Sequence, residues 1–293
     1  MEKTKAKSVH WIDVVKPTEK DLAKLKKDFN LHPVIVEELR TPSPRTRVEV
    51  YSHYLYFTYY FPIYDAAEGT STRNEIDFIV TKEVVVTVRY EPFEGVFDGF
   101  AAEPGENSLE LMYRLVKQLI VFEERQLRHI REKVEAVGRE LFKSKERDIL
   151  EQINYLKRDV SEYRIVVRLQ EPILRSLLLR GEKFWAGDAE VYLTDLLGEQ
   201  AKIVSQLEDC RDAIADFETT NSGLLNLKIN NVMKTLASLS FVAFPAILLA
   251  EIFTMNTRGI PIVNRPDAFW IIVGTMAVMV LTTYWYFKRK DWL

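Results

Sequence analysis

Cysteine is almost absent from this 293-residue chain, which contains only Cys210. A single cysteine rules out an intrachain disulfide, and its charged neighbours Asp209, Arg211 and Asp212 predict a solvated helix. The bulk of the chain is therefore expected in a reducing compartment. An excess of charge of either sign is also missing, because 40 basic residues stand against 43 acidic ones. A near-neutral chain offers no electrostatic footprint for nucleic acid, so duplex binding is not expected.

Motifs for enzymatic chemistry are missing as well. The sequence has no P-loop, no Gly-x-Ser-x-Gly and no dinucleotide fingerprint, so ATP hydrolysis and acyl transfer have no visible machinery. Residues 1–8 are charged and lack the apolar core of a signal peptide. The histidines are scattered, without the spacing of zinc ligands: His10, His32, His53 and His129. We expect neither an enzyme nor an exported protein.

Long apolar runs are present, and they gather near the C-terminus. Residues 268–287 carry no charge, and as a helix these twenty residues would span about 30 Å, the thickness of a bilayer core. Residues 235–255 carry one charge, Glu251, over a length that buried globular helices rarely reach. Only residues 257–267 separate the two runs. The pattern predicts a transmembrane helical hairpin whose two ends lie on the same side of the bilayer.

The basic residues around these runs predict their orientation. Arg258 and Arg265 lie in the loop between the runs. Five basic residues flank the two runs at their ends away from this loop: Lys228, Lys234, Lys288, Arg289 and Lys290. Because cytoplasmic flanks carry an excess of Lys and Arg, we expect a multi-pass protein of the cell membrane with both termini in the cytoplasm.

Residues 1–107 predict an α/β domain that includes a sheet. Thr18 and Asp21 resemble a capping box at the start of a helix that reaches about Phe29. Ser108 is expected to cap the change to helical periodicity that follows. Strand patterns, the last two joined as a hairpin, occur at residues 9–14, 54–63, 76–81 and 84–89.

Two later tracts repeat apolar residues at alternating spacings of three and four. The first comprises Leu127, Ile130, Val134, Val137 and Leu141, and the second comprises Leu193, Leu196, Gln200, Ile203, Leu207, Cys210, Ile214 and Phe217. This spacing is typical of a coiled-coil seam. One unbroken helix over residues 188–255 would be about 100 Å long and would form a stalk. The alternative is a pair of helices broken at residues 221–223, because Gly disfavours a helix.

Residues 230–256 resemble the inner helix of the CorA family of Mg²⁺/Co²⁺ channels. Asn-x-Val-Met-Lys precedes the apolar run, a proline lies within it, and Met-Asn follows it; residues 11–39 also look like the family's N-terminal domain. The matching positions are Asn230, Met233, Lys234, Pro245, Met255, Asn256 and the basic tail that ends in Trp292 and Leu293. The resemblance implies an α/β cytoplasmic domain, a long-helix coiled-coil stalk and two transmembrane helices, assembled into a funnel-shaped homopentamer in the lipid bilayer.

The resemblance also implies six segments with different roles. They are a cytoplasmic α/β domain (1–107), a helical stalk (108–232), an inner pore-lining transmembrane helix (233–256), an extracytoplasmic loop (257–267), an outer transmembrane helix (268–287) and a basic cytoplasmic tail (288–293). The expected cargo is hydrated Mg²⁺, with Co²⁺, Ni²⁺ or Zn²⁺ as alternates. Passive flow suffices, because a divalent ion that crosses 100 mV gains about 4.6 kcal/mol.

In the family, the Asn of a Gly-Met-Asn triplet lines the outer pore entrance, and Asn256 matches it here. Neutral carbonyl dipoles suit Mg²⁺, which gives up its water reluctantly. The alternative role for Asn256 is a helix C-cap. Thr254 replaces the glycine, and its Cβ resists positive φ and close backbone approach. This departure leaves a second function open, a non-conducting membrane-anchored assembly for metal sensing or scaffolding.

One helical face collects the candidate pore residues. It comprises Met233, Ala237, Ser240, Phe244, Ile247, Glu251 and Thr254, at spacings of four and three. Five copies of Glu251 would form a carboxylate ring, which is a hypothesis because burying an isolated charge in a bilayer costs about 2.5 to 3.5 kcal/mol. The alternative is that Glu251 snorkels to the interface or pairs with Arg258. Met233, Leu236 and Phe244 are expected to form apolar constrictions that gate by excluding water, or else to pack helices.

Relatives are closed by intracellular Mg²⁺ that binds between the cytoplasmic domains of neighbouring subunits, so the resemblance implies a regulatory site of this kind here. No spacing in the sequence selects its ligands. Asp77, Glu83 and Glu103 are expected to be solvated surface charges rather than metal ligands.

Overall fold

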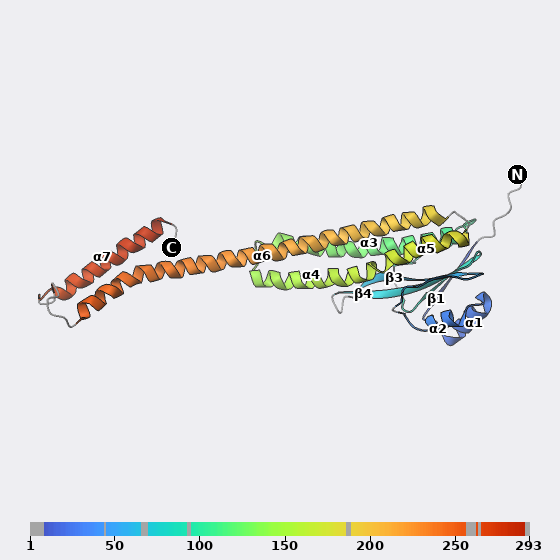
Figure 1. The fold of residues 1–293 in the computed structure, drawn as a ribbon, viewed down its shortest axis with the longest axis horizontal. Coiled ribbons are helices and arrows are strands. Elements are labelled where there is room, and N and C mark those ends of the chain that lie inside the picture. The colour runs from blue at the N-terminus through green and yellow to red at the C-terminus, as the bar shows by residue number, and fades with distance from the viewer. Residues whose placement is uncertain are drawn as a thin grey trace. The chain divides into compact units, whose positions relative to one another are not determined.

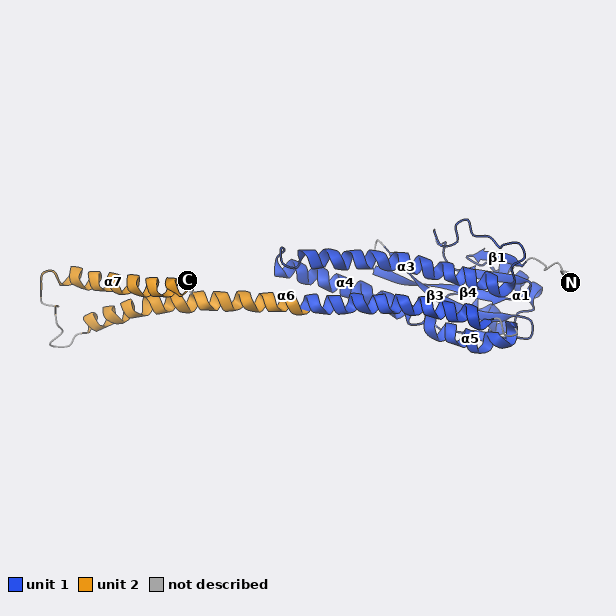
Figure 2. Cartoon of the chain, turned by 90° about the horizontal axis from the view of Figure 1, so that it is seen from above, with its two compact units in different colours: residues 1–218 blue, residues 219–293 orange. Residues whose placement is uncertain are grey.

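The computed structural model describes residues 9–43, 45–65, 70–92, 95–185, 189–255, 262 and 265–290. The chain divides into two compact units, Met1–Glu218 and Thr219–Leu293, which Figure 2 colours separately. Asn256, Arg258 and Trp292 lie outside the described residues, so the predictions that concern them stay predictions.

A five-stranded sheet forms the centre of the first unit. Its strands are β1 (His10–Val15), β2 (Val48–Val50), β3 (Leu55–Asp65), β4 (Thr70–Val80) and β5 (Val84–Arg89). They lie in the order β1-β5-β4-β3-β2, with β1 parallel to β5 and the other neighbours antiparallel. The predicted hairpin of β4 and β5 is confirmed. The three-residue β2 was not predicted, because it is too short to show a pattern.

Two short helices, α1 (Glu19–Phe29) and α2 (Pro33–Glu38), cover one face of the sheet (Figure 1). The capping box predicted at Thr18 and Asp21 is present, since each side chain bonds the other's backbone N–H. Leu22 and Ile35 are buried against Tyr56 and Val86 of the sheet. This packing explains why so short a helical pair is stable, since isolated helices of this length are marginal in water.

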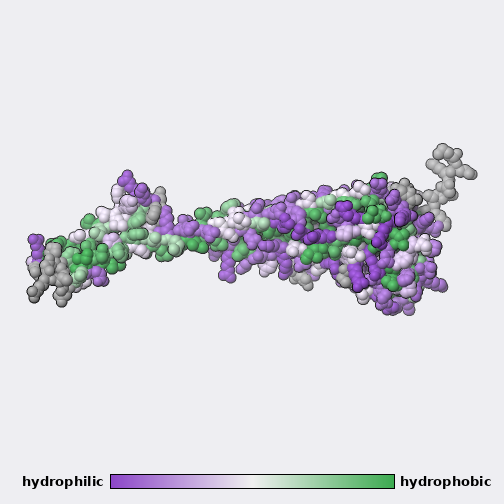
Figure 3. Space-filling view, in the orientation of Figure 1, coloured by the Kyte–Doolittle hydropathy of each residue, from purple (hydrophilic) through white to green (hydrophobic). Residues whose placement is uncertain are grey.

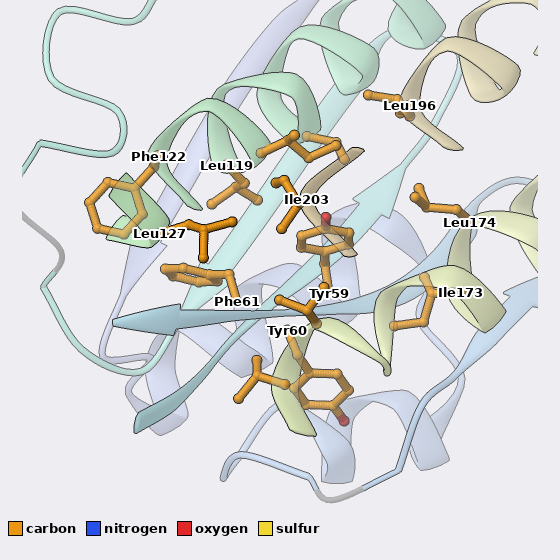
Figure 4. Close-up of a cluster of buried hydrophobic side chains, with 14 of the residues drawn as sticks. Tyr59, Tyr60, Phe61, Leu119, Phe122, Leu127, Ile173, Leu174, Leu196 and Ile203 are labelled. Atoms are coloured by element: carbon orange, nitrogen blue, oxygen red, sulfur yellow. The ribbon is translucent and has the colours of Figure 1, made fainter. Parts of the chain in front are cut away.

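Four helices cover the opposite face: α3 (Ser108–Glu140), α4 (Glu146–Val167), α5 (Gln170–Trp185) and the first part of α6 (Ala189–Thr254). Figure 4 shows Phe61 of β3, Leu119 of α3 and Ile203 of α6 within one cluster of buried side chains. The expected cap at Ser108 is wrong by one residue. Asn107 caps α3, because its side chain accepts the backbone N–H groups of Leu109 and Glu110.

The predicted seams are buried and pack α3 beside α6. All residues of both seams are buried except Phe217, which packs partly buried against the same core. The order of the contacts shows that the two helices run in the same direction. The pairs are Glu110 with Tyr192 at 3.2 Å, Lys117 with Asp195 at 2.8 Å and Glu124 with Lys202 at 2.9 Å.

Two expectations about α6 have clear outcomes. Cys210 is buried rather than solvated, because it occupies the seam while its charged neighbours point outward. The break considered at residues 221–223 is absent, and α6 runs as one helix of 66 residues from the first unit into the second. Gly223 is tolerated because its cost of about 1 kcal/mol is small beside the hydrogen bonds of so long a helix. The predicted fold class, an α/β domain followed by a long helix and two apolar C-terminal helices, is confirmed.

Candidate functional site

The second unit consists of the last part of α6 and the helix α7 (Ala268–Arg289). Both helices are long and apolar enough to cross a bilayer, and almost none of their apolar surface is buried within the chain. Figure 3 shows hydrophobic side chains on the surface of this part of α6. Apolar surface of this extent requires a cover other than water.

Helix α7 lies along one side of α6 in both views of the chain (Figures 1 and 2). The rings of Phe241 and Phe287 stack at a centroid distance of 6.0 Å. The residues of α6 with reduced exposure on this side are Ser238, Val242, Pro245, Leu249 and Phe253. Their spacing of three and four places them on one face of the helix.

The candidate pore residues occupy the opposite face. At 100° per residue, Met233 and Glu251 point in the same direction, roughly 140° to 180° from Ser238 and Val242. Every member of the predicted face is exposed, from Met233 at 61% through Phe244 at 63% to Thr254. Asn230 and Leu236 are exposed beside them. Among the residues that the structure describes, none covers this face of α6 between Met233 and Thr254.

Glu251 and Thr254 lie in the last turn of α6. The Thr254 hydroxyl donates a hydrogen bond to the backbone carbonyl of Glu251 at 2.9 Å. Thr254 ends the helix and is not among the described residues with positive φ, so this backbone does not require the glycine of the family triplet. Met255 follows the helix with an exposed side chain, and Asn256 lies outside the described part of the chain.

The basic residues after the second apolar run begin inside α7. Lys288 and Arg289 form its last turn, and Lys290 caps it. The Lys288 ammonium lies 5.9 Å from the ring centroid of Tyr284, and the Arg289 guanidinium lies 5.4 Å from that of Trp285. Cations and aromatic rings at the end of an apolar helix are typical of a membrane interface.

Two carboxylates, Asp77 and Glu123, are buried inside the first unit, and this burial was not predicted from the sequence. Asp77 was expected to be a solvated charge, like Glu83 and Glu103, but it is fully buried. The hydroxyls of Tyr56 and Thr58 donate to its Oδ1 at 2.7 and 2.9 Å, and the Tyr90 hydroxyl donates to its Oδ2. Burial raises the pKa of Asp77 to about 6, although these hydroxyls oppose the shift. The expectation failed because β4 is covered on both faces, so its alternation does not expose Asp77.

Glu123 of α3 is fully buried, as Asp77 is. Its Oε1 accepts a hydrogen bond from Gln170 Nε2 of α5 at 2.7 Å, and Tyr163 of α4 donates to its backbone carbonyl at 2.7 Å. Burial raises the pKa of Glu123 well above its ordinary value, although the hydrogen bond from Gln170 opposes the shift. The sequence contained a signal for this burial, because Glu123 precedes Leu127 by four residues and so continues the apolar seam of that helix.

Within the described ranges, no group of three or more His, Cys, Asp or Glu residues is arranged to hold a metal ion. Asp77 is saturated by hydroxyl donors, which is the environment of a structural carboxylate rather than of a ligand awaiting a cation.

Comparison with known proteins places the chain. A family model described as CorA-like Mg²⁺ transporter protein matches residues 6–289. The cobalt/magnesium transport protein CorA of Thermotoga maritima is 22% identical over 273 residues, which cover 90% of this chain and 78% of that protein. The putative metal ion transporter YfjQ of Bacillus subtilis is 22% identical over 293 residues, with coverage of 97% and 89%.

Solved structures share the fold at low sequence identity. The complete structure of the CorA magnesium transporter from Methanocaldococcus jannaschii matches with a TM-score of 0.82 and 17% identity, covering 97% of this chain and 91% of that one. The full-length CmaX protein matches with a TM-score of 0.72 and 19% identity, covering 96% and 88%. Because the family model spans nearly the whole chain and its two apolar helices are in place, the chain belongs to the CorA-like Mg²⁺ transporter family and is a divalent metal ion transporter of membranes, not an enzyme.

Proposed function

We propose that this protein conducts divalent cations passively through a homopentameric channel, with Mg²⁺ as the main substrate and Co²⁺, Ni²⁺ or Zn²⁺ as further substrates. Its relatives include a cobalt/magnesium transport protein and a magnesium transporter. The described residues contain no metal cluster that would make the ion a resident cofactor. In this proposal the ion is the transported substrate.

The exposed face of α6 carries this proposal. Two helices cannot enclose a water-filled path, whereas a ring of copies related by rotational symmetry can. With α7 covering one side of α6, the opposite side is the one available to line a shared axis. Asn230, at the start of this face, would then meet hydrated ions at the inner end of the path. Met233, Leu236, Phe244 and Ile247 would form its apolar constrictions.

The outer mouth belongs to the end of α6 and the residue after it. We assign Thr254, Met255 and Asn256 to this mouth, with the Asn256 amide oxygen facing the water shell of the ion. Thr254 directs its hydroxyl hydrogen to the backbone of Glu251, so its oxygen lone pairs stay available to an ion or its water.

The proposal also sets the orientation in the membrane. Lys288, Arg289 and Lys290 would lie at the cytoplasmic surface of the cell membrane, where anionic lipid attracts basic residues. The first unit would then be cytoplasmic, since it precedes the first span. A membrane potential that is negative inside drives divalent cations toward this side.

Flux through liposomes tests the function directly. Purified full-length protein in liposomes should take up Mg²⁺ faster when a potassium gradient sets the inside negative, and reversing the potential should slow uptake. The same protein should restore growth of a bacterial strain that lacks magnesium uptake. If the reconstituted assembly passes none of the four ions under either potential, the non-conducting sensor or scaffold is the better account.

A further inference from the structure

Glu251 is the only ionisable side chain on the exposed face of α6 between Met233 and Met255. It lies three residues before the end of the helix, and its side chain is exposed on the side away from α7. Ionisable residues within membrane spans are rare and face a partner, a cavity or a water-filled path. Packing within the described part of the chain therefore does not account for a glutamate at this position.

The surroundings of Glu251 leave its carboxylate free within the described part of the chain. Its backbone carbonyl accepts a hydrogen bond from the Thr254 hydroxyl. No described residue forms a hydrogen bond or an ion pair with its carboxylate oxygens. The nearest basic residue on α6 is Lys234, seventeen positions earlier and about 25 Å away along the helix axis. The exposed side of this turn therefore offers the carboxylate oxygens of Glu251 beside the hydroxyl oxygen of Thr254.

We propose that five copies of Glu251 form a carboxylate ring that binds one divalent cation by direct coordination and sets the order of preference among ions. This inference rests on the pentameric channel proposed above. Rotational symmetry places five equivalent carboxylates at one level of the path, about one helical turn inside the mouth. The ring supplies more oxygen atoms than one cation can use, so an ion can shed part of its water there.

The chemistry of such a ring differs between ions. Mg²⁺ dehydrates reluctantly and keeps several of its waters at protein sites. Among first-row divalent metals, affinity for a given set of oxygen ligands rises from Mn²⁺ through Co²⁺ to Ni²⁺. The ring therefore holds Co²⁺ and Ni²⁺ longer than Mg²⁺. These metals should block the Mg²⁺ flux at low concentration, because an ion that binds tightly leaves slowly.

The flux test compares Glu251→Gln and Glu251→Asp with the unaltered full-length protein in liposomes. Losing even an outer partner of a metal site typically weakens binding by about 10- to 100-fold, so Glu251→Gln should raise the Ni²⁺ concentration for half-block at least about tenfold. Glu251→Asp keeps the charge and should stay closer to the unaltered protein. Glu162→Gln, at an exposed position of α4, is the matched control and should change nothing.

Direct Ni²⁺ binding provides a readout that does not depend on flux. Equilibrium dialysis of the detergent-purified full chain with Ni²⁺ alone should find about one more tightly bound ion per pentamer than in Glu251→Gln. Equal binding by the two proteins, or the same half-block by Ni²⁺, overturns the ring and leaves the channel function intact. Absence of flux from the unaltered protein overturns the channel instead, and the dialysis still decides whether the ring exists.

Discussion

Individual carboxyl groups in the first unit differ in what their surroundings do to them. Three hydroxyl groups donate to Asp77, and these bonds oppose the effect of burial, which still raises the pKa of Asp77 to about 6. Glu123 receives one hydrogen bond, from the neutral amide of Gln170, and burial raises its pKa well above the ordinary value, which favours the protonated form. A buried neutral carboxyl ties folding to proton binding, because the unfolded chain releases that proton at ordinary pH.

Replacing Glu123 with Gln should flatten the pH dependence of stability. Because the folded-state pKa of Glu123 is raised, its favourable contribution is full below its ordinary value of 4.5 and is lost as the pH rises toward the folded-state value. Gln needs no proton and retains an oxygen that Gln170 can bond. Between about pH 5 and pH 8, the unaltered protein should lose stability relative to Glu123→Gln by up to about 1.4 kcal/mol per pH unit.

Thermal unfolding of the detergent-purified full chain, followed by circular dichroism over that pH range, measures this difference. Glu75, whose pKa is raised to about 8 by burial and then by the charge of Asp77, contributes a slope of the same sign to both proteins and cancels. Glu162→Gln serves as the exposed control. Parallel Tm curves for the unaltered protein and Glu123→Gln would show that the carboxyl is not protonated in the fold.

Between elements, the close contact of α3 with α6 depends on a glycine. A Cβ placed on Gly138 would lie 2.9 Å from Cζ of Phe217, closer than carbon atoms pack without a shift. The ring of Phe217, the last residue of the α6 seam, therefore lies against the backbone of α3 at Gly138. Gly198, on the exposed side of α6, has nothing within 4 Å of the corresponding position. Both glycines lie inside helices, but only Gly138 packs against the side chain of another helix.

Substituting each glycine with Ala separates packing from helix propensity. Ala favours a helix interior over Gly by about 0.8 to 1.0 kcal/mol, so Gly198→Ala should raise the free energy of unfolding by up to that amount. Gly138→Ala should gain less or become destabilising, because overpacking a filled contact typically costs about 1 to 3 kcal/mol. Circular dichroism melts of the full chain compare them. Equal stabilisation would mean that Phe217 moves aside without cost.

At the scale of the whole molecule, the exposed face of α6 is the reason why the proposed membrane path needs more than one chain. A face that combines Ser240, Phe244 and Glu251 is too polar for lipid at one end and too apolar for water at the other. Copies arranged around an axis would resolve the conflict by enclosing it. The proposed assembly therefore predicts which residues of neighbouring copies approach one another.

Cysteine crosslinking tests this arrangement with a matched pair of positions. Cys210 is the only native cysteine, so Cys210→Ala gives a background without thiols. In that background, Ser240→Cys on the exposed face should yield a covalent dimer with a short bifunctional thiol reagent in native membranes. Val242→Cys, on the side toward α7, should stay monomeric. Dimers from Val242→Cys alone would place the opposite face of α6 at the axis and sink the assignment of the pore.

Much of this molecule follows from local pattern. The capping box at Thr18, the hairpin of β4 and β5 and the seams of α3 and α6 were predicted because each depends on residues a few positions apart. The apolar runs at α6 and α7 were equally clear, since composition over some twenty residues is enough to indicate a membrane helix. Phase along α6 predicted the face that groups Met233 with Glu251, because helical geometry alone fixes which residues share a side.

Other features depend on contacts between distant segments, and only the tertiary structure decided them. Asp77 is buried because α2 and the strand end at Tyr90 close over β4, and the pKa of Glu123 is raised because the helices packed around α3 bury its carboxyl. Whether the exposed face of α6 was free depended on where α7 lies, which the sequence of α6 does not contain. Periodicity assigns residues to a side of an element, whereas burial, charge state and exposure are set by what the fold brings to that side.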